Sequence, residues 1–199
     1  MARALPLFPA LFLALTIASP AAAGRLEDDV LAELNYVRAH PERYAQELAE
    51  ALDTGQSAFR TLPDEDPEVV AETIAYLMDQ PSLPPLRAHA GLSAAAAAHV
   101  RAQARRGTEG HGGEPLSRRL QRHGLFAGLS GENISYGYRT PRDVVLQLVV
   151  DSRVPGRGHR KTIFGRNWQA AGVACGPHAA YGAMCVIDFA GAIVERGAQ

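Results

Sequence analysis

Apolar residues recur at helical spacing over most of the first half of the chain. Between Arg25 and Arg38 they stand at Leu26, Val30, Leu34 and Val37, three or four residues apart, as on one face of a helix. Helix-start signals, a proline in the first turn or a serine N-cap, open similar patterns further on. These patterns predict three more helices, over Pro41–Leu52, Asp66–Met78 and Ser93–Arg106.

The second half of the chain alternates short helices with β-type segments. Residues Gly131–Gly137 predict a strand, and Trp168–Cys175 with Ala183–Phe189 predict a terminal hairpin. One helix is expected before the first of these strands, over Pro115–His123, and another between that strand and the hairpin, from Pro141 to Leu148. Leading helices and late strands indicate an α+β domain, in which helices pack over a mostly antiparallel sheet.

The first 23 residues have the layout of a secretory signal. Arg3 supplies a positive start, Leu5–Ala18 carries no charge, and Ala21-Ala22-Ala23 offers a cleavage site of small residues. The apolar run is short for a membrane span, which needs about 20 residues, although a retained N-terminal anchor stays open as an alternative. We therefore expect a signal peptide over 1–23, a single domain over 24–199, and a protein secreted to the periplasm or the medium.

The charge and cysteine content of the chain bear on its binding partners and on a possible disulfide. The chain has 20 basic and 21 acidic residues, so nothing in its bulk charge favours nucleic acid. No apolar stretch after the signal is long enough to span a membrane. In an oxidising compartment Cys175 and Cys185, on two strand-like segments, can form one disulfide, with two buried thiols as the alternative.

Four residues can carry chemistry. His111 lies among glycines, Glu132 begins a predicted strand, Asp151 ends a predicted helix, and His159 follows it. Imidazoles and carboxylates together suit a divalent metal or acid–base catalysis. Taken singly, each also has a structural interpretation: a loop histidine, a cap for backbone amides, a helix-end carboxylate, and a histidine that donates to a carbonyl.

Five segments in order carry a family resemblance: GHGG, GENISYG, VVLQLVVD, GHRKTIFGRNWQAAGVACG and MCVIDFAG. Together they resemble the CAP superfamily of cysteine-rich secretory proteins, antigen 5 and plant pathogenesis-related proteins, and most closely its bacterial SCP-like branch. The resemblance covers roughly Leu26 to Gly191. It implies an α-β-α sandwich whose central cleft holds two histidines and two acidic residues.

The resemblance implies a cleft tetrad of His111, Glu132, Asp151 and His159, in which the two histidines would hold a divalent metal such as zinc. Two positions depart from the family pattern. Asp151 is one methylene shorter than the usual glutamate, and Leu148 stands where many members carry tryptophan.

We expect the other polar and aromatic residues near these motifs to have structural roles. Asn133 is expected to tie a loop to the strand. Arg160 is expected to lie on a solvated face, with pairing to acids near the cleft as the alternative. Tyr136 and Tyr138 either line a groove or cover the sheet. Five histidines have no partner motif and are expected to be incidental: His40, His89, His99, His123 and His178.

Three functions follow as hypotheses. The first is a secreted module that binds a divalent metal, a small ligand such as a lipid or an envelope component, or both. The second is a metal-assisted hydrolase, against which the sequence shows no nucleophile motif around Ser130 or Ser135. The third is a structural protein of the envelope, in which the polar cluster only stabilises the fold.

Overall fold

The computed structural model describes residues 20–55, 59 and 61–195. Three helices lead the chain: α1 (Pro20–Ala39), α2 (Pro41–Thr54) and α3 (Pro67–Met78). Their boundaries follow the sequence signals, because Gly55 ends α2 in the left-handed conformation and the Asp66 side chain caps α3 by accepting from the Glu68 amide. A 3-10 turn, η1 (Leu62–Asp64), precedes α3.

Helix α4 (Ala90–Ala104) begins three residues before the predicted N-cap Ser93. The Ser93 amide already donates to the His89 carbonyl at 3.0 Å, so Ser93 completes the first turn and cannot cap it. The remaining helices are α5 (Leu116–Arg122), α6 (Pro141–Val150) and α7 (Gly158–Ile163), of which α7 was not predicted.

A four-stranded sheet in the order β1-β4-β5-β3 forms the centre of the fold. Its strands are β1 (Arg87–Ala88), β3 (Ser130–Tyr136), β4 (Ala170–Gly176) and β5 (Met184–Ala190). The β4–β5 and β3–β5 pairs are antiparallel, and only the short β1 runs parallel to β4. This confirms the mostly antiparallel sheet. A separate two-stranded ribbon joins β2 (Leu125–Ala127) to β6 (Ile193–Glu195).

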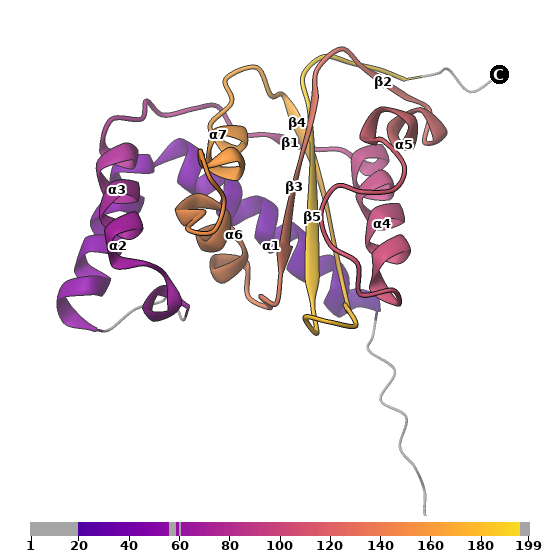
Figure 1. Ribbon diagram of the computed structural model, residues 1–199. Coiled ribbons are helices and arrows are strands. Elements are labelled where there is room, and N and C mark those ends of the chain that lie inside the picture. The colour runs from indigo at the N-terminus through magenta and orange to yellow at the C-terminus, as the bar shows by residue number, and fades with distance from the viewer. Residues whose placement is uncertain (1–19, 56–58, 60, 196–199) are drawn as a thin grey trace, which may run out of the picture.

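Helices cover both faces of the sheet. In Figure 1, α4 and α5 lie on one side of the strands, and α1, α6 and α7 lie on the other, with α2 and α3 beyond them. Strand alternation assigns the side chains. Val173 and Ile187 join the core with α1 and α6, whereas Ala174 and Val186 pack with residues of α4. The α-β-α sandwich is therefore confirmed, and β3 lies at the edge of the sheet.

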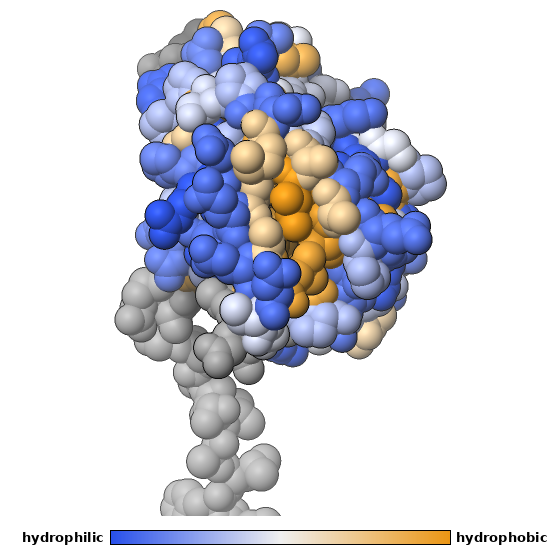
Figure 2. Space-filling view, turned by 90° about the vertical axis from the view of Figure 1, so that its left-hand side faces the viewer, coloured by the Kyte–Doolittle hydropathy of each residue, from blue (hydrophilic) through white to orange (hydrophobic). Residues whose placement is uncertain are grey.

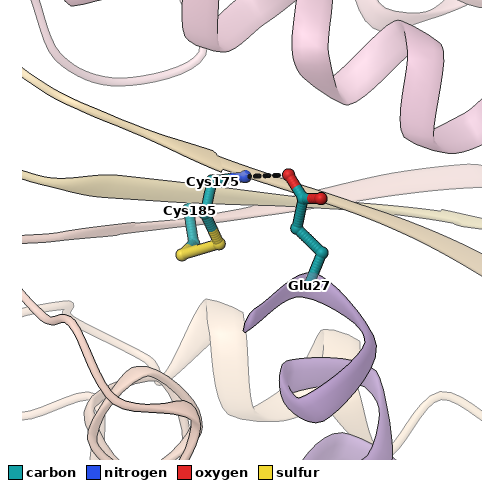
Figure 3. The surroundings of a disulfide bond; sticks show 3 residues. All are labelled: Glu27, Cys175 and Cys185. Carbon is teal, nitrogen blue, oxygen red and sulfur yellow. Dashed lines mark hydrogen bonds between the residues drawn. A yellow bond between two sulfur atoms is a disulfide. The ribbon is translucent and has the colours of Figure 1, made fainter. Parts of the chain in front are cut away.

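The predicted disulfide is present. Cys175 and Cys185 face each other across β4 and β5, with an S–S distance of 2.07 Å. Figure 3 shows both sulfur atoms on the side of the sheet that faces α1. The Glu27 carboxylate on α1 accepts a hydrogen bond of 2.9 Å from the Cys175 amide and thereby ties this helix to the strand.

The end of the molecule formed by α2 and α3 carries an apolar strip. Figure 2 shows it as an orange band bordered by hydrophilic residues. Leu52 of α2 and Met78 of α3 are among the exposed large apolar side chains. Among the described residues, no helix has the length and apolar character needed to cross a bilayer. Most of the predicted signal peptide, residues 1–19, lies outside the described residues, and its cleavage point falls near the start of α1.

Candidate functional site

Two histidine–carboxylate pairs lie in one cleft beside the edge strand β3. His111 Nδ1 lies 2.8 Å from Glu132 Oε1, and His159 Nδ1 lies 2.8 Å from Asp151 Oδ1. The two imidazole centroids are 6.5 Å apart. The structure thus brings together all four residues of the tetrad, with one pair supplied from the α4–α5 layer and β3, and the other from the α6–α7 segment.

The first pair joins a loop to the strand. His111 follows Gly110, whose φ of +81° is in the region that favours glycine. Glu132 projects from β3 toward the α4–α5 layer, and its side chain is only 5 % exposed, whereas that of His111 is 57 % exposed. Because an ionised carboxylate only accepts, His111 carries its proton on Nδ1.

The second pair is built at the end of α6. Asp151 is the C-cap of this helix, at a φ of +56°, and is fully buried. Its Oδ1 accepts from His159 Nδ1 and its Oδ2 accepts from the His159 amide at 2.9 Å. The predicted tie by Asn133 is confirmed, because its Nδ2 donates to the His159 carbonyl at 3.0 Å. The left-handed turn thus brings the shorter aspartate side chain within hydrogen-bond distance of its histidine.

A buried network that the sequence analysis missed lies behind Glu132. Arg119 of α5 is 2 % exposed and pairs with Glu132 and, at 3.3 Å, with Asp188 of β5. Its Nη1 also donates to His99 Nδ1 at 3.0 Å. His99 was expected to be incidental, but it is 3 % exposed and lies 3.2 Å from the Gly110 carbonyl through Nε2. No local motif links these residues, because α4, α5 and β5 meet only in the folded chain.

The charges of this network shift the pKa values of its members. Burial alone would raise the pKa of Glu132, but the hydrogen bond from His111 and the Arg119 guanidinium lower it overall. The same hydrogen bond to Glu132 raises the pKa of His111. Burial raises the pKa of Asp188 to about 8, and burial lowers that of His99. Glu132 is therefore the ionised carboxyl at neutral pH, and Asp188 and His99 are neutral.

The His159 segment is held from the opposite side by α3. Arg160 was predicted to lie on a solvated face, which is wrong, since it is 2 % exposed. It donates to Glu72 of α3 at 2.7 Å and to the Val149 and Val150 carbonyls of α6. Its methylene stem and planar guanidinium can be buried because those carbonyls and the Glu72 carboxylate satisfy its donors.

The cleft extends beyond the two histidines as a cavity of about 540 Å³. Tyr136 and Tyr138 both line it, which resolves the alternatives left open by the sequence. Tyr136 packs against His178 and Tyr181, with ring centroids 5.1 and 5.3 Å away. His178 was also expected to be incidental, but it is buried and supports this tyrosine wall. Ser135 cannot act in the cleft, since it is buried on the other face of β3.

The donor set of the cleft fits an open metal site with two protein ligands. Both Nδ1 atoms are engaged by carboxylates, and the structure gives neither Nε2 atom a hydrogen-bond partner among the described residues. His111 and His159 both line the cavity. In the described part of the chain no group of three or more histidine, cysteine or acidic residues is placed to hold an ion. Water or a bound ligand would have to complete the coordination.

Comparison with known proteins identifies the family. The profile of the cysteine-rich secretory protein family, CAP, matches residues 31–189. The chain belongs to the CAP family. This confirms the resemblance drawn from the GHGG, GENISYG and GHRKTIF segments, and the match includes all four tetrad residues. A search of curated protein sequences finds no significant match.

A solved bacterial structure supports the fold at low sequence identity. An extracellular protein of Bacillus anthracis that contains an SCP domain is 15 % identical, with a TM-score of 0.51 over 89 % of this chain and 45 % of that protein. This CAP chain therefore spans less than half the length of the Bacillus protein. An outer surface protein of Borrelia burgdorferi is also 15 % identical, with a TM-score of 0.47 over 62 % of this chain and 86 % of that one.

Proposed function

We propose that this CAP protein is a secreted binding module whose cleft holds a divalent metal ion, such as zinc, between His111 and His159. The observation that carries the proposal is the pairing of each Nδ1 with a carboxylate. In metal sites a histidine commonly donates its second N–H to a carboxylate, which fixes the tautomer and raises the basicity of the ligating nitrogen. Glu132 and Asp151 are placed for this role on both histidines.

Two imidazoles make a weak and accessible site. Structural zinc ions take four protein ligands and catalytic zinc ions usually three, so an ion held by His111 and His159 would keep two or more positions for exchangeable ligands. Its affinity should fall as the pH falls, since protons compete for the imidazoles. The hydrogen bond to Glu132 raises the pKa of His111, so protons compete for this imidazole at a higher pH than they would for an unperturbed histidine.

Room for a ligand lies beside the proposed ion. The 540 Å³ cavity is lined by tyrosines and also by polar groups, including Gln147 and Arg153. Apolar pockets with a few placed polar groups are typical small-molecule sites. A ligand with both apolar and polar faces fits this lining better than a bare acyl chain, so we favour a small envelope component over a lipid.

The metal site is tested by titrating the chain that begins at Gly24 with zinc and measuring heat by calorimetry. The variants His111→Ala and His159→Ala should each bind zinc at least tenfold more weakly than the wild type. The double variant should release no measurable heat of zinc binding. His123→Ala is the matched control, because His123 is exposed and lies outside the cleft cavity. Unchanged affinity in the double variant with an unchanged circular dichroism spectrum would refute the proposal.

Export is tested on the full chain expressed in a bacterium. Signal cleavage after Ala23 predicts a soluble product beginning at Gly24, which intact-mass measurement identifies. A product of full-length mass in the membrane fraction would support the retained anchor instead.

A further inference from the structure

One guanidinium group is linked to both supports of His111, to the first directly and to the second through His99. The first support is the carboxylate of Glu132, which accepts from His111 Nδ1 and pairs with Arg119 Nη2. The second is the Gly110 backbone, which immediately precedes His111. The Gly110 carbonyl lies 3.2 Å from His99 Nε2, and His99 Nδ1 lies 3.0 Å from Arg119 Nη1. The contacts therefore close a ring that runs from Arg119 through His99, Gly110, His111 and Glu132 back to Arg119.

The donors in this ring determine the tautomers. Arginine only donates, so His99 Nδ1 must be the acceptor and His99 carries its proton on Nε2, which then donates to the Gly110 carbonyl. His111 carries its proton on Nδ1, because its partner is a carboxylate. Burial lowers the pKa of His99, which keeps the His99 imidazole neutral beside the charged Arg119. Two histidines in one network thus hold opposite tautomers.

Both backbone polar groups of Gly110 are hydrogen-bonded. Besides His99, Gln103 donates to its carbonyl at 2.6 Å, and its own amide donates to the Tyr136 hydroxyl at 2.8 Å. Among the described residues, the His159 half of the cleft shows no comparable ring of hydrogen bonds. There Asp151 accepts both from the His159 imidazole and from the His159 amide.

We propose that Arg119 is the positioning residue of the His111 half of the cleft: through Glu132 it fixes the His111 ring, and through His99 it fixes the loop that carries that ring. The predicted result is an Nε2 atom of His111 that is unprotonated and aimed for binding before any ligand arrives. The consequence for zinc affinity rests on the proposed metal site, whereas the tautomers and the loop order do not.

The test replaces Arg119 by lysine, which keeps the charge but offers no planar fork to contact Glu132, Asp188 and His99 together. The neighbouring exposed Arg118→Lys is the matched control. Nitrogen-15 chemical shifts of the imidazoles are measured in the metal-free protein. Wild type and Arg118→Lys should show His99 as the Nε2–H form and both His111 and His159 as the Nδ1–H form.

In Arg119→Lys the His99 and His111 signals should move toward averaged tautomers, while those of His159 stay in place. Zinc affinity should fall by roughly 10- to 100-fold, as for other residues that orient metal-binding histidines. If the His99 and His111 signals match those of Arg118→Lys, the inference is wrong. If they move as expected but even the wild type binds no zinc, the positioning role stands and the metal proposal fails.

A second variant covers the case in which Arg119→Lys does not fold. His99→Ala leaves both partners of the Arg119–Glu132 ion pair in place and removes the imidazole that links Arg119 to Gly110. Faster hydrogen exchange at the His111 amide, with unchanged exchange at His159, is the expected result. Equal exchange rates at His111 in this variant and in the wild type would overturn the inference.

Discussion

At the scale of single residues, the site depends on how the carboxyl groups of Glu132 and Asp188 share the guanidinium of Arg119. Glu132 and Asp188 are register partners on β3 and β5, and Arg119 contacts both. Ionising both of these neighbouring, buried carboxyl groups would carry a large free-energy penalty, because burial and like charge both oppose it. The contact with the half-exposed His111 favours ionisation of Glu132, and the complete burial of Asp188 favours its neutral form. The proton that Asp188 retains then removes the second negative charge beside Glu132.

The Asp188→Asn variant should be more stable than the wild type at neutral pH. The unfolded chain releases the Asp188 proton near the ordinary value of 3.8, whereas burial holds the folded pKa at about 8. Between these pH values the folded chain binds more protons, so rising pH lowers the wild-type free energy of unfolding. Asparagine has the shape of the neutral acid and avoids this loss, which we expect to be on the order of 1–3 kcal/mol at pH 8.

Urea denaturation at pH 4 and pH 8 measures this difference. The two proteins should be nearly equal at pH 4 and diverge at pH 8, with Asp53→Asn, at an exposed position on α2, as the control. A variant less stable than wild type at pH 8 would show that Asp188 acts as an anion.

At the scale of elements, the sequence predicted the long helices and the strands well. Regular apolar spacing with clear end signals gave α1, α2, α3 and α6, because those patterns are local. It missed the six-residue α7, the two-residue β1 and the three-residue strands β2 and β6, since such short elements depend on tertiary contacts.

The difference between local patterns and tertiary contacts also explains which site residues could be predicted from the sequence. The tetrad could be named from family motifs, but His99 and Asp188 could not. Neither residue belongs to a local motif, and the role of each appears only when Arg119 reaches it across the fold. Arg160 was misjudged for the same reason, because Glu72 lies 88 positions away in the sequence.

Close packing between α4 and β4 gives the next prediction. A methyl group added at Gly172 would lie 2.1 Å from the Ser93 amide nitrogen and 2.3 Å from the Leu92 carbonyl carbon. Both are backbone atoms, so the helix itself would have to move. Gly172→Ala should therefore lower the free energy of unfolding by about 1–3 kcal/mol or more.

Thermal denaturation checks this loss. Gly112→Ala is the matched control, because an added methyl there would meet nothing within 4 Å, and its melting temperature should stay close to that of the wild type. If the two alanine variants melt together, α4 and β4 are less closely packed than the structure indicates.

At the scale of the whole molecule, the disulfide and the Glu132 half of the cleft lie on opposite faces of the sheet. The sulfur atoms of Cys175 and Cys185 face α1, whereas Glu132 and Asp188 face α4 and α5. The strands between them are held by a continuous antiparallel ladder from Gly176–Met184 to Ala170–Ala190. Cross-linking and ligand binding should therefore be separable properties of this fold.

The double variant Cys175→Ala, Cys185→Ala tests that separation. The bridge closes a loop across a sequence separation of 10 residues, and removing it should cost about 3 kcal/mol of stability by the chain-entropy estimate. Zinc affinity should stay within about twofold of wild type, since in the described part of the chain the hydrogen bonds and ion pairs of the four cleft residues involve neither cysteine. Dithiothreitol should destabilise the wild type to the level of the variant and leave the variant unchanged. Loss of zinc binding in a variant that still unfolds cooperatively would show instead that the bridge constrains the cleft through β5, the strand that carries both Cys185 and Asp188.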